Sequence, residues 1–147
     1  MSKSMTSSVF PDVNVWLALS SRDHQHFTTA WNWYKGLPDQ TVLVFCRLTQ
    51  LSFLRLLTTQ SVMGRGTLTQ GHAWKAYDQW RVAGGVEFTY EPVGLEAVLR
   101  SFTVAERASP KEWADAYLAA FSLVSELPLV TFDRALAGKA KGAVLLG

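Results

Sequence analysis

The sequence predicts an α/β fold in which amphipathic helices cover a mainly parallel sheet. Short apolar runs typical of strands alternate along the chain with segments in which apolar residues recur at positions i, i+3, i+4 and i+7. The chain has 147 residues and 48% of them are hydrophobic, which suits one domain with a well-filled core. We therefore expect a single domain over residues 1–147, with residues 1–7 as a flexible N-terminal extension.

Five apolar runs are expected to form the strands of this sheet: Ser8–Phe10, Thr41–Phe45, Val86–Tyr90, Leu127–Phe132 and Ala143–Leu146. Helical spacing of apolar residues predicts three helices between them, over Phe27–Tyr34, Ala73–Trp80 and Leu95–Phe102.

Two more helices are expected from other signals. The segment Arg47–Thr58 reads as a helix, and Val62–Gly66, which holds two glycines, as a loop after it. The run Ser109–Glu112 predicts a helix start, with Ser as N-cap, Pro at the first helical position and Glu closing a capping box. In the helix that follows, Trp113 falls at a core spacing and is expected to pack inside.

Composition narrows the classes of function. With one cysteine, Cys46, no internal disulfide can form, and with three histidines a Cys/His zinc cluster is not expected, so any metal is expected to be held by oxygen. No apolar run approaches the roughly 20 residues of a membrane-spanning helix, and the N-terminus lacks the apolar region of a secretory signal. We expect a cytoplasmic protein with no membrane partner. A net charge of +2 is too small to indicate whether the protein binds nucleic acid.

Asp115 is an acid in a place where acids are costly. It is the only acidic or basic side chain between Trp113 and Ser125, a segment that is apolar nearly all round a helix. A buried carboxylate costs several kcal/mol unless it is paired or holds a metal, so Asp115 calls for a partner. A salt bridge to a basic residue on a neighbouring helix is the simpler alternative.

Asp12 and Asp133 stand in matching places, each just after an expected strand. Ligands of open parallel sheets bind outside the carboxyl ends of the strands, so acids placed there point toward a common crevice. Asp12 and Asp133 are each also explained as a helix N-cap, but this alternative does not explain Asp115.

Three carboxylates crowded together repel one another unless a cation lies among them. Oxygen ligands suit Mg²⁺ or Mn²⁺, and such an ion activates water and stabilises charge on a phosphodiester, so the trio of Asp12, Asp115 and Asp133 predicts a metal-dependent nuclease. Asn14 and Thr131 are candidates to orient ligands or waters.

Three segments in order resemble the acidic signatures of the PIN-domain family, and within it the VapC-type ribonuclease toxins: Phe10–Leu17, Asp115–Ala120 and Leu129–Arg134. The similarity extends from about Val9 to the last expected strand. It implies a three-layer α/β/α sandwich, endonucleolytic cleavage of RNA with Mg²⁺ or Mn²⁺, a VapB-like antitoxin that docks across the groove, and a homodimer. Asp12, Asp115 and Asp133 match the family's acids residue by residue.

The chain departs from the family at Gln50, where a glutamate is common. On the helical wheel Gln50 shares a stripe with Phe53, Leu54 and Leu57 and is expected to face inward. An amide oxygen binds a metal or its water without adding negative charge, so the site has three acids rather than four. A catalytically weakened PIN domain that binds RNA or an antitoxin therefore stays open as an alternative.

Three arginines are candidates for contacts to RNA phosphate: Arg47, Arg55 and Arg134. Each is also explained as an ordinary solvated side chain. Glu112, one turn before Asp115, is a further candidate for the metal, although a capping role already accounts for it. A phosphatase or receiver domain is a weaker alternative, because a second aspartate would be expected at Asn14.

Overall fold

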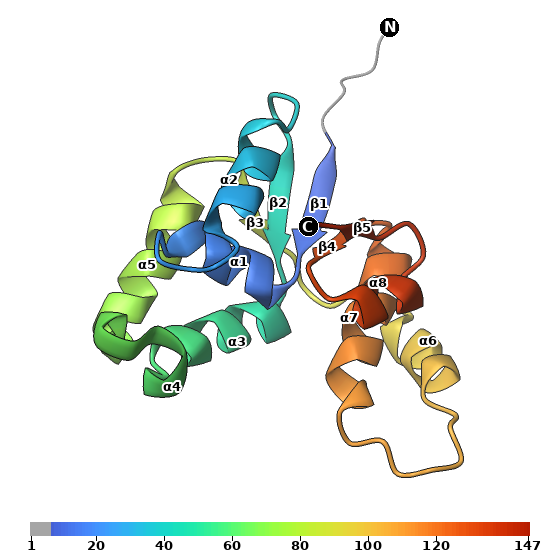
Figure 1. Cartoon of the computed structure of the whole chain (residues 1–147). Helices are drawn as coiled ribbons and strands as arrows, with labels where there is room; N and C mark the ends of the chain where they lie inside the picture. The colour runs from blue at the N-terminus through green and yellow to red at the C-terminus, as the bar shows by residue number, and fades with distance from the viewer. Residues whose placement is uncertain (1–6) are drawn as a thin grey trace, which may run out of the picture.

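The computed structural model describes residues 7–147 and contains a five-stranded sheet (Figure 1). Its strands are β1 (Ser8–Pro11), β2 (Val42–Phe45), β3 (Val86–Phe88), β4 (Leu129–Thr131) and β5 (Val144–Leu145). They lie in the order β3-β2-β1-β4-β5, and every neighbouring pair is parallel. The five predicted strands and the parallel sheet are confirmed.

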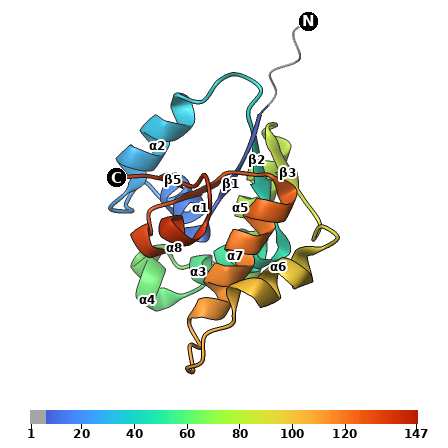
Figure 2. The ribbon, with the colours of Figure 1, turned by 90° about the vertical axis from the view of Figure 1, so that its right-hand side faces the viewer.

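Helices cover both faces of the sheet. One face carries α1 (Val13–Ser20), α2 (Phe27–Lys35), α3 (Arg47–Leu57) and α5 (Gln70–Val82). The other carries α6 (Leu95–Phe102), α7 (Glu112–Ser125) and α8 (Arg134–Lys139), and Figure 2 turns this face toward the viewer. The predicted three-layer α/β/α sandwich is therefore confirmed.

Successive residues of a strand pack alternately into the two sides of the core. In β2, Leu43 and Phe45 join the cluster on the α1 side while Val44 joins the cluster on the α7 side, and in β4 Leu129 and Val130 divide in the same way. Successive side chains of a strand point to opposite faces, so a sheet covered on both faces needs apolar residues at every position. This explains why the strands read as continuous apolar runs.

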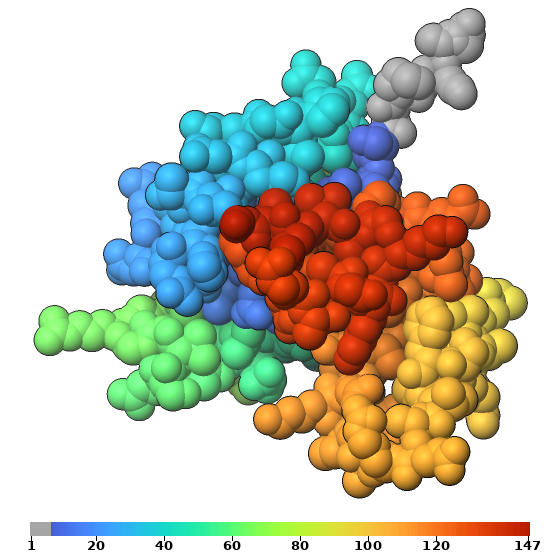
Figure 3. Space-filling view, turned by 45° about the vertical axis from the view of Figure 1, so that its right-hand side comes forward, coloured from blue at the N-terminus to red at the C-terminus, as the bar shows by residue number. Residues whose placement is uncertain are grey.

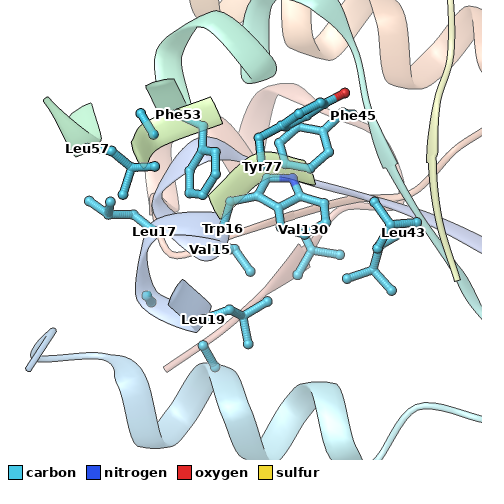
Figure 4. Packing of buried hydrophobic residues seen from close by; sticks show 14 residues of the cluster. Val15, Trp16, Leu17, Leu19, Leu43, Phe45, Phe53, Leu57, Tyr77 and Val130 are labelled. Atoms are coloured by element: carbon cyan, nitrogen blue, oxygen red, sulfur yellow. The ribbon is translucent and has the colours of Figure 1, made fainter. Parts of the chain in front are cut away.

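Aromatic side chains pack against one another among the aliphatic residues of the core on the α1 side (Figure 4). The ring of Trp16 stacks on Phe45 with centroids 3.9 Å apart, and Tyr77 meets Phe45 edge-on at 4.9 Å. Fully buried rings of this size contribute several kcal/mol through burial and contact. This packing holds α1 against the sheet and so fixes the junction between β1 and α1.

Three local expectations were wrong. Residues 62–66 are not a loop, because α4 (Gln60–Met63) continues into a 3₁₀ turn, η1 (Gly64–Gly66). Ser109 is not the N-cap of α7, because the helix begins at Glu112 after Lys111, and the Ser109 hydroxyl makes no hydrogen bond to the described residues. Trp113 is 61% exposed, because the buried residues of α7 begin at Ala116.

At the N-terminus, residues 1–6 of the predicted flexible extension lie outside the described residues. The Ser7 carbonyl accepts the N–H of Val42 at 2.8 Å, next to the first β1–β2 pairing. Over the part of the chain that is described, no helix has the length and apolar character needed to cross a membrane.

Candidate active site

Asp12 lies at the junction of β1 and α1 and is 5% exposed. Its Oδ1 accepts the backbone N–H of Val13 at 2.6 Å, as an N-cap of α1, and its Oδ2 accepts the Thr131 hydroxyl at 2.9 Å. Burial raises the pKa of Asp12, and repulsion from Asp115 and Asp133 adds to the rise, while the two hydrogen bonds oppose it.

Thr131, the last residue of β4, is fully buried and joins two of the predicted acids. Its hydroxyl donates to Asp12 and accepts the backbone N–H of Asp133 at 3.0 Å. Asp133 is exposed, and its Oδ1 caps α8 by accepting the Leu136 N–H at 3.1 Å. The helix-capping alternative thus holds for both Asp12 and Asp133, alongside their placement at one edge of the sheet.

Asp115 comes from the first turn of α7 on the other side of this edge. Its side chain is 30% exposed, more than an apolar helix predicted, because the first turn extends beyond the buried part of α7. Burial raises its pKa, Lys139 lowers it, and Asp133 and Glu112 raise it again. The predicted salt-bridge alternative is also present, since Lys139 Nζ lies 3.8 Å from Asp115 Oδ2.

The three aspartates therefore come from three separate segments and lie near enough to repel one another. Their oxygen chemistry fits a hard divalent ion. Nevertheless, within residues 7–147 no group of three Asp, Glu, His or Cys side chains is spaced to hold an ion between them. An ion bound here would have to draw the carboxylates closer together.

Gln50 is buried in α3, as its helical position predicted. Its Oε1 accepts a hydrogen bond from Arg47 Nη1, and the Arg47 guanidinium lies 4.6 Å over the ring of Phe88. The amide oxygen of Gln50 is thus already engaged by the guanidinium of Arg47.

The remaining candidates are exposed. Asn14 lies in the first turn of α1, Arg134 directly follows Asp133, and Arg55 lines a groove between α3 and α5 together with Trp74. Of the three arginines, Arg134 is the nearest in sequence to a predicted acid.

Two charged residues near Asp115 complete this edge. Glu112 carries an ion pair to Arg107 at 2.8 Å and a longer one to Lys139 at 3.9 Å. A hollow of about 190 Å³ beside them is lined by Phe102, Glu112, Ala116, Ala119 and Lys139. Sequence reasoning missed Lys139; its only local signal is a basic residue in the last turn of the short helix that Asp133 begins.

The chain is similar to proteins of one known family. The family model of the PIN domain matches residues 9–142. Ribonuclease VapC41 of Mycobacterium tuberculosis, in two strains, is 43% identical over 133 residues, which cover 84% of this chain and 88% of that protein.

Two solved structures share the fold at low sequence identity. The M. tuberculosis toxin VapC20, described as cleaving the sarcin–ricin loop, gives a TM-score of 0.63 at 18% identity and covers 88% of this chain and 93% of its own. VapBC2 from Rickettsia felis, bound to a DNA fragment from its promoter, gives a TM-score of 0.66 at 8% sequence identity. The match covers 94% of this chain and 96% of that one. The match to the family model and the 43% identity confirm the resemblance: the chain belongs to the PIN-domain family, and within it to the VapC-type ribonuclease toxins of toxin–antitoxin systems.

Proposed function

We propose that this chain is an Mg²⁺- or Mn²⁺-dependent endoribonuclease in which Asp12, Asp115 and Asp133 hold the ion. The observation that carries the proposal is the state of Asp12. This carboxylate is 5% exposed, its two hydrogen-bond donors are both neutral, and the nearby Asp115 and Asp133 raise its pKa further. A divalent cation between the three would remove the repulsion and make full ionisation favourable.

The ion, when bound, would supply an activated water and stabilise charge on the phosphodiester. The chain's own residues would set the geometry. Thr131 holds Asp12 in one orientation through its hydroxyl, and Asn14, which is exposed in the first turn of α1, would hold a water. Arg134, which directly follows Asp133 in the sequence, would bind a neighbouring RNA phosphate, with Arg47 and Arg55 as weaker candidates.

Cleavage of a panel of structured RNAs, including tRNA and ribosomal fragments, tests the proposal. We expect cleavage with Mg²⁺ or Mn²⁺, and a loss of at least about 100-fold in Asp115→Asn, because removal of one charged ligand weakens both ion binding and charge stabilisation. Asp78→Asn, an exposed acid on α5, is the matched control and should cleave normally. Cleavage that persists in EDTA, or in Asp115→Asn, would contradict the proposal.

We also propose an RNA substrate, a VapB-like antitoxin, assembly as a homodimer and action in the cytoplasm. Membership of the VapC-type toxins supports the first two. A short reading frame just upstream that encodes a protein able to bind and inhibit this chain would support the antitoxin. Light scattering of the purified chain at micromolar concentration measures the oligomeric state, and a strictly monomeric mass would contradict the homodimer.

A weakened PIN domain that only binds RNA or an antitoxin is the second candidate. It is favoured by Gln50, whose amide oxygen is already engaged by Arg47 and adds no charge to the site. Metal-dependent cleavage by Gln50→Glu, together with no cleavage by the unmodified chain, would support this second candidate. Efficient cleavage by the unmodified chain would rule it out.

A further inference from the structure

Lys139 holds an unusual position beside the candidate metal site. Its Nζ lies 3.8 Å from Asp115 Oδ2 and 3.9 Å from Glu112 Oε1, so one ammonium is shared by two carboxylates one turn apart on α7. The end of α8 that carries Lys139 is anchored by the buried side chains of Leu136 and Ala140. The ammonium is therefore brought to these acids by the packing of the fold.

Glu112 helps to keep the ammonium in place. Its Oε2 binds Arg107 at 2.8 Å while its Oε1 faces Lys139, so each oxygen of this carboxylate has a separate cation. Asp115, in contrast, has Lys139 as its recorded cation and Asp133 and Glu112 as repelling neighbours. Of the two carboxylates, Asp115 is thus the one that a stronger cation can draw away.

We propose that Lys139 is a built-in counter-ion that occupies the cation position between Asp115 and Glu112 and competes with the divalent ion for Asp115. This inference rests on the proposed metal site. It accounts for the spacing of the acids, because Asp115 is paired with Lys139 of α8 and, over residues 7–147, no three acids are spaced to hold an ion. With a divalent ion held by Asp12, Asp115 and Asp133, Asp115 would no longer pair with Lys139, and Glu112 would retain the ammonium. Lys139 is thus a positioning residue that sets the affinity of the site for metal.

Mn²⁺ binding measured by isothermal titration calorimetry tests this role without reference to catalysis. Lys139→Met removes the ammonium that competes with the divalent ion for Asp115 and that repels the ion as it approaches. We expect Mn²⁺ to bind about three- to tenfold more tightly than to the unchanged chain. Lys139→Arg, which keeps the charge, should bind Mn²⁺ like the unchanged chain. Lys141→Met, which removes an exposed lysine two residues away, should also leave the affinity unchanged.

Thermal unfolding gives a second readout. In EDTA, Lys139→Met should melt below the unchanged chain, because Asp115 and Glu112 lose a shared counter-charge. Saturating Mn²⁺ should then raise its melting temperature by more than it raises that of the unchanged chain, since a tighter ligand stabilises the folded state more. Lys139 is 40% exposed, so the substitution leaves the core intact, and Lys139→Gln provides a second neutral variant.

The outcomes separate the two proposals. If the unchanged chain binds Mn²⁺ and both neutral variants bind it with equal or lower affinity, the role of Lys139 is overturned while the metal site stands. If neither the unchanged chain nor the neutral variants bind Mn²⁺, the metal site itself is overturned, and the role of Lys139 with it. Tighter binding in both neutral variants but not in Lys139→Arg supports the inference.

Discussion

The two halves of the candidate site are built in different ways. On the β1–β4 side, Asp12, Thr131 and Asp133 are held by hydrogen bonds of 2.6 to 3.1 Å to backbone N–H groups and a buried hydroxyl. On the α7–α8 side, Asp115 and Lys139 meet through an ion pair of 3.8 Å between partly exposed side chains. We call these the fixed half and the adjustable half.

The difference matters because the two kinds of contact resist movement unequally. A buried hydrogen bond to a short side chain leaves little freedom, and breaking it leaves an unpaired polar group. A partly exposed ion pair between flexible side chains is worth about 0.2–1 kcal/mol and is easily exchanged for a better partner. The fixed half is therefore expected to define where an ion binds, and the adjustable half to close onto it. The four predictions below test this division.

Thr131→Val should have the largest effect on stability. The valine keeps the volume but leaves Asp12 Oδ2 and the Asp133 N–H without their shared partner inside the protein. We expect the free energy of unfolding to fall by about 1–3 kcal/mol in urea titrations. Thr103→Val, which removes a half-buried hydroxyl just after α6, should change it by less than about 0.5 kcal/mol. Equal effects of the two substitutions would show that the fixed half is not held by this hydroxyl.

The pH dependence of stability should identify Asp12. Because burial raises its pKa above the ordinary 3.8, the unfolded chain loses this proton first as pH rises, and stability falls from about pH 3.8 until the folded-state pKa is passed. At neutral pH, each unit by which folding raises the pKa of Asp12 lowers the free energy of unfolding by about 1.4 kcal/mol.

Asp12→Asn should remove this loss, so in EDTA its stability relative to the unchanged chain should increase between pH 3.5 and pH 7.5. Chemical unfolding at a series of pH values measures the difference. A difference that stays constant across this range would show that Asp12 ionises as freely as an exposed carboxylate.

Gln50→Glu asks whether α3 belongs to the site at all. If its side chain faces the ion, the added charge should tighten Mn²⁺ binding by about fivefold, an electrostatic gain of roughly 1 kcal/mol that the Arg47 side chain partly offsets. Gln79→Glu makes the same chemical change on the exposed face of α5 and serves as control. An unchanged affinity in Gln50→Glu would place residue 50 outside the reach of the ion.

Asp115→Asn should have the smallest effect on stability, in contrast to its effect on cleavage. The change removes the pair with Lys139 but also the repulsion from Asp133 and Glu112. We expect the free energy of unfolding in EDTA to stay within about 0.5 kcal/mol of the unchanged chain. A fall of more than about 2 kcal/mol would mean that the adjustable half is as firmly built as the fixed one.

The sequence predicted more of the fixed half than of the adjustable half. The fixed half follows from local order: apolar runs identify β1 and β4, and the geometry of a parallel sheet then brings the residues after them to one edge. The sheet and the helices predicted over Phe27–Tyr34, Ala73–Trp80 and Leu95–Phe102 follow from similar local signals, because continuous apolar runs and a period of 3.6 residues are visible in neighbouring positions of the sequence.

In the adjustable half, the sequence predicted Asp115 and, as an alternative, a salt bridge to a basic residue on a neighbouring helix. It did not identify Lys139, because this contact joins separate helices. The pair of Lys139 with Asp115 spans the loop and strand between α7 and α8, and α8 has only six residues, too few to show a periodic pattern. The capping box expected at Ser109 failed because Glu112 turns to Arg107 and Lys139 instead. Trp113 was placed in the core by its spacing alone, whereas the first turn of α7 extends past the layer that would cover it.

Each of the three aspartates also stands where a helix begins. Asp12 precedes α1, Asp133 precedes α8, and Asp115 lies in the first turn of α7. The backbone N–H groups at these helix starts carry partial positive charge, which the macrodipole of each helix reinforces. The edge that gathers three carboxylates is therefore lined by the peptide backbone with charge of the opposite sign. That charge softens the repulsion between the acids and gives an approaching polyanion an attraction that no side-chain substitution would remove.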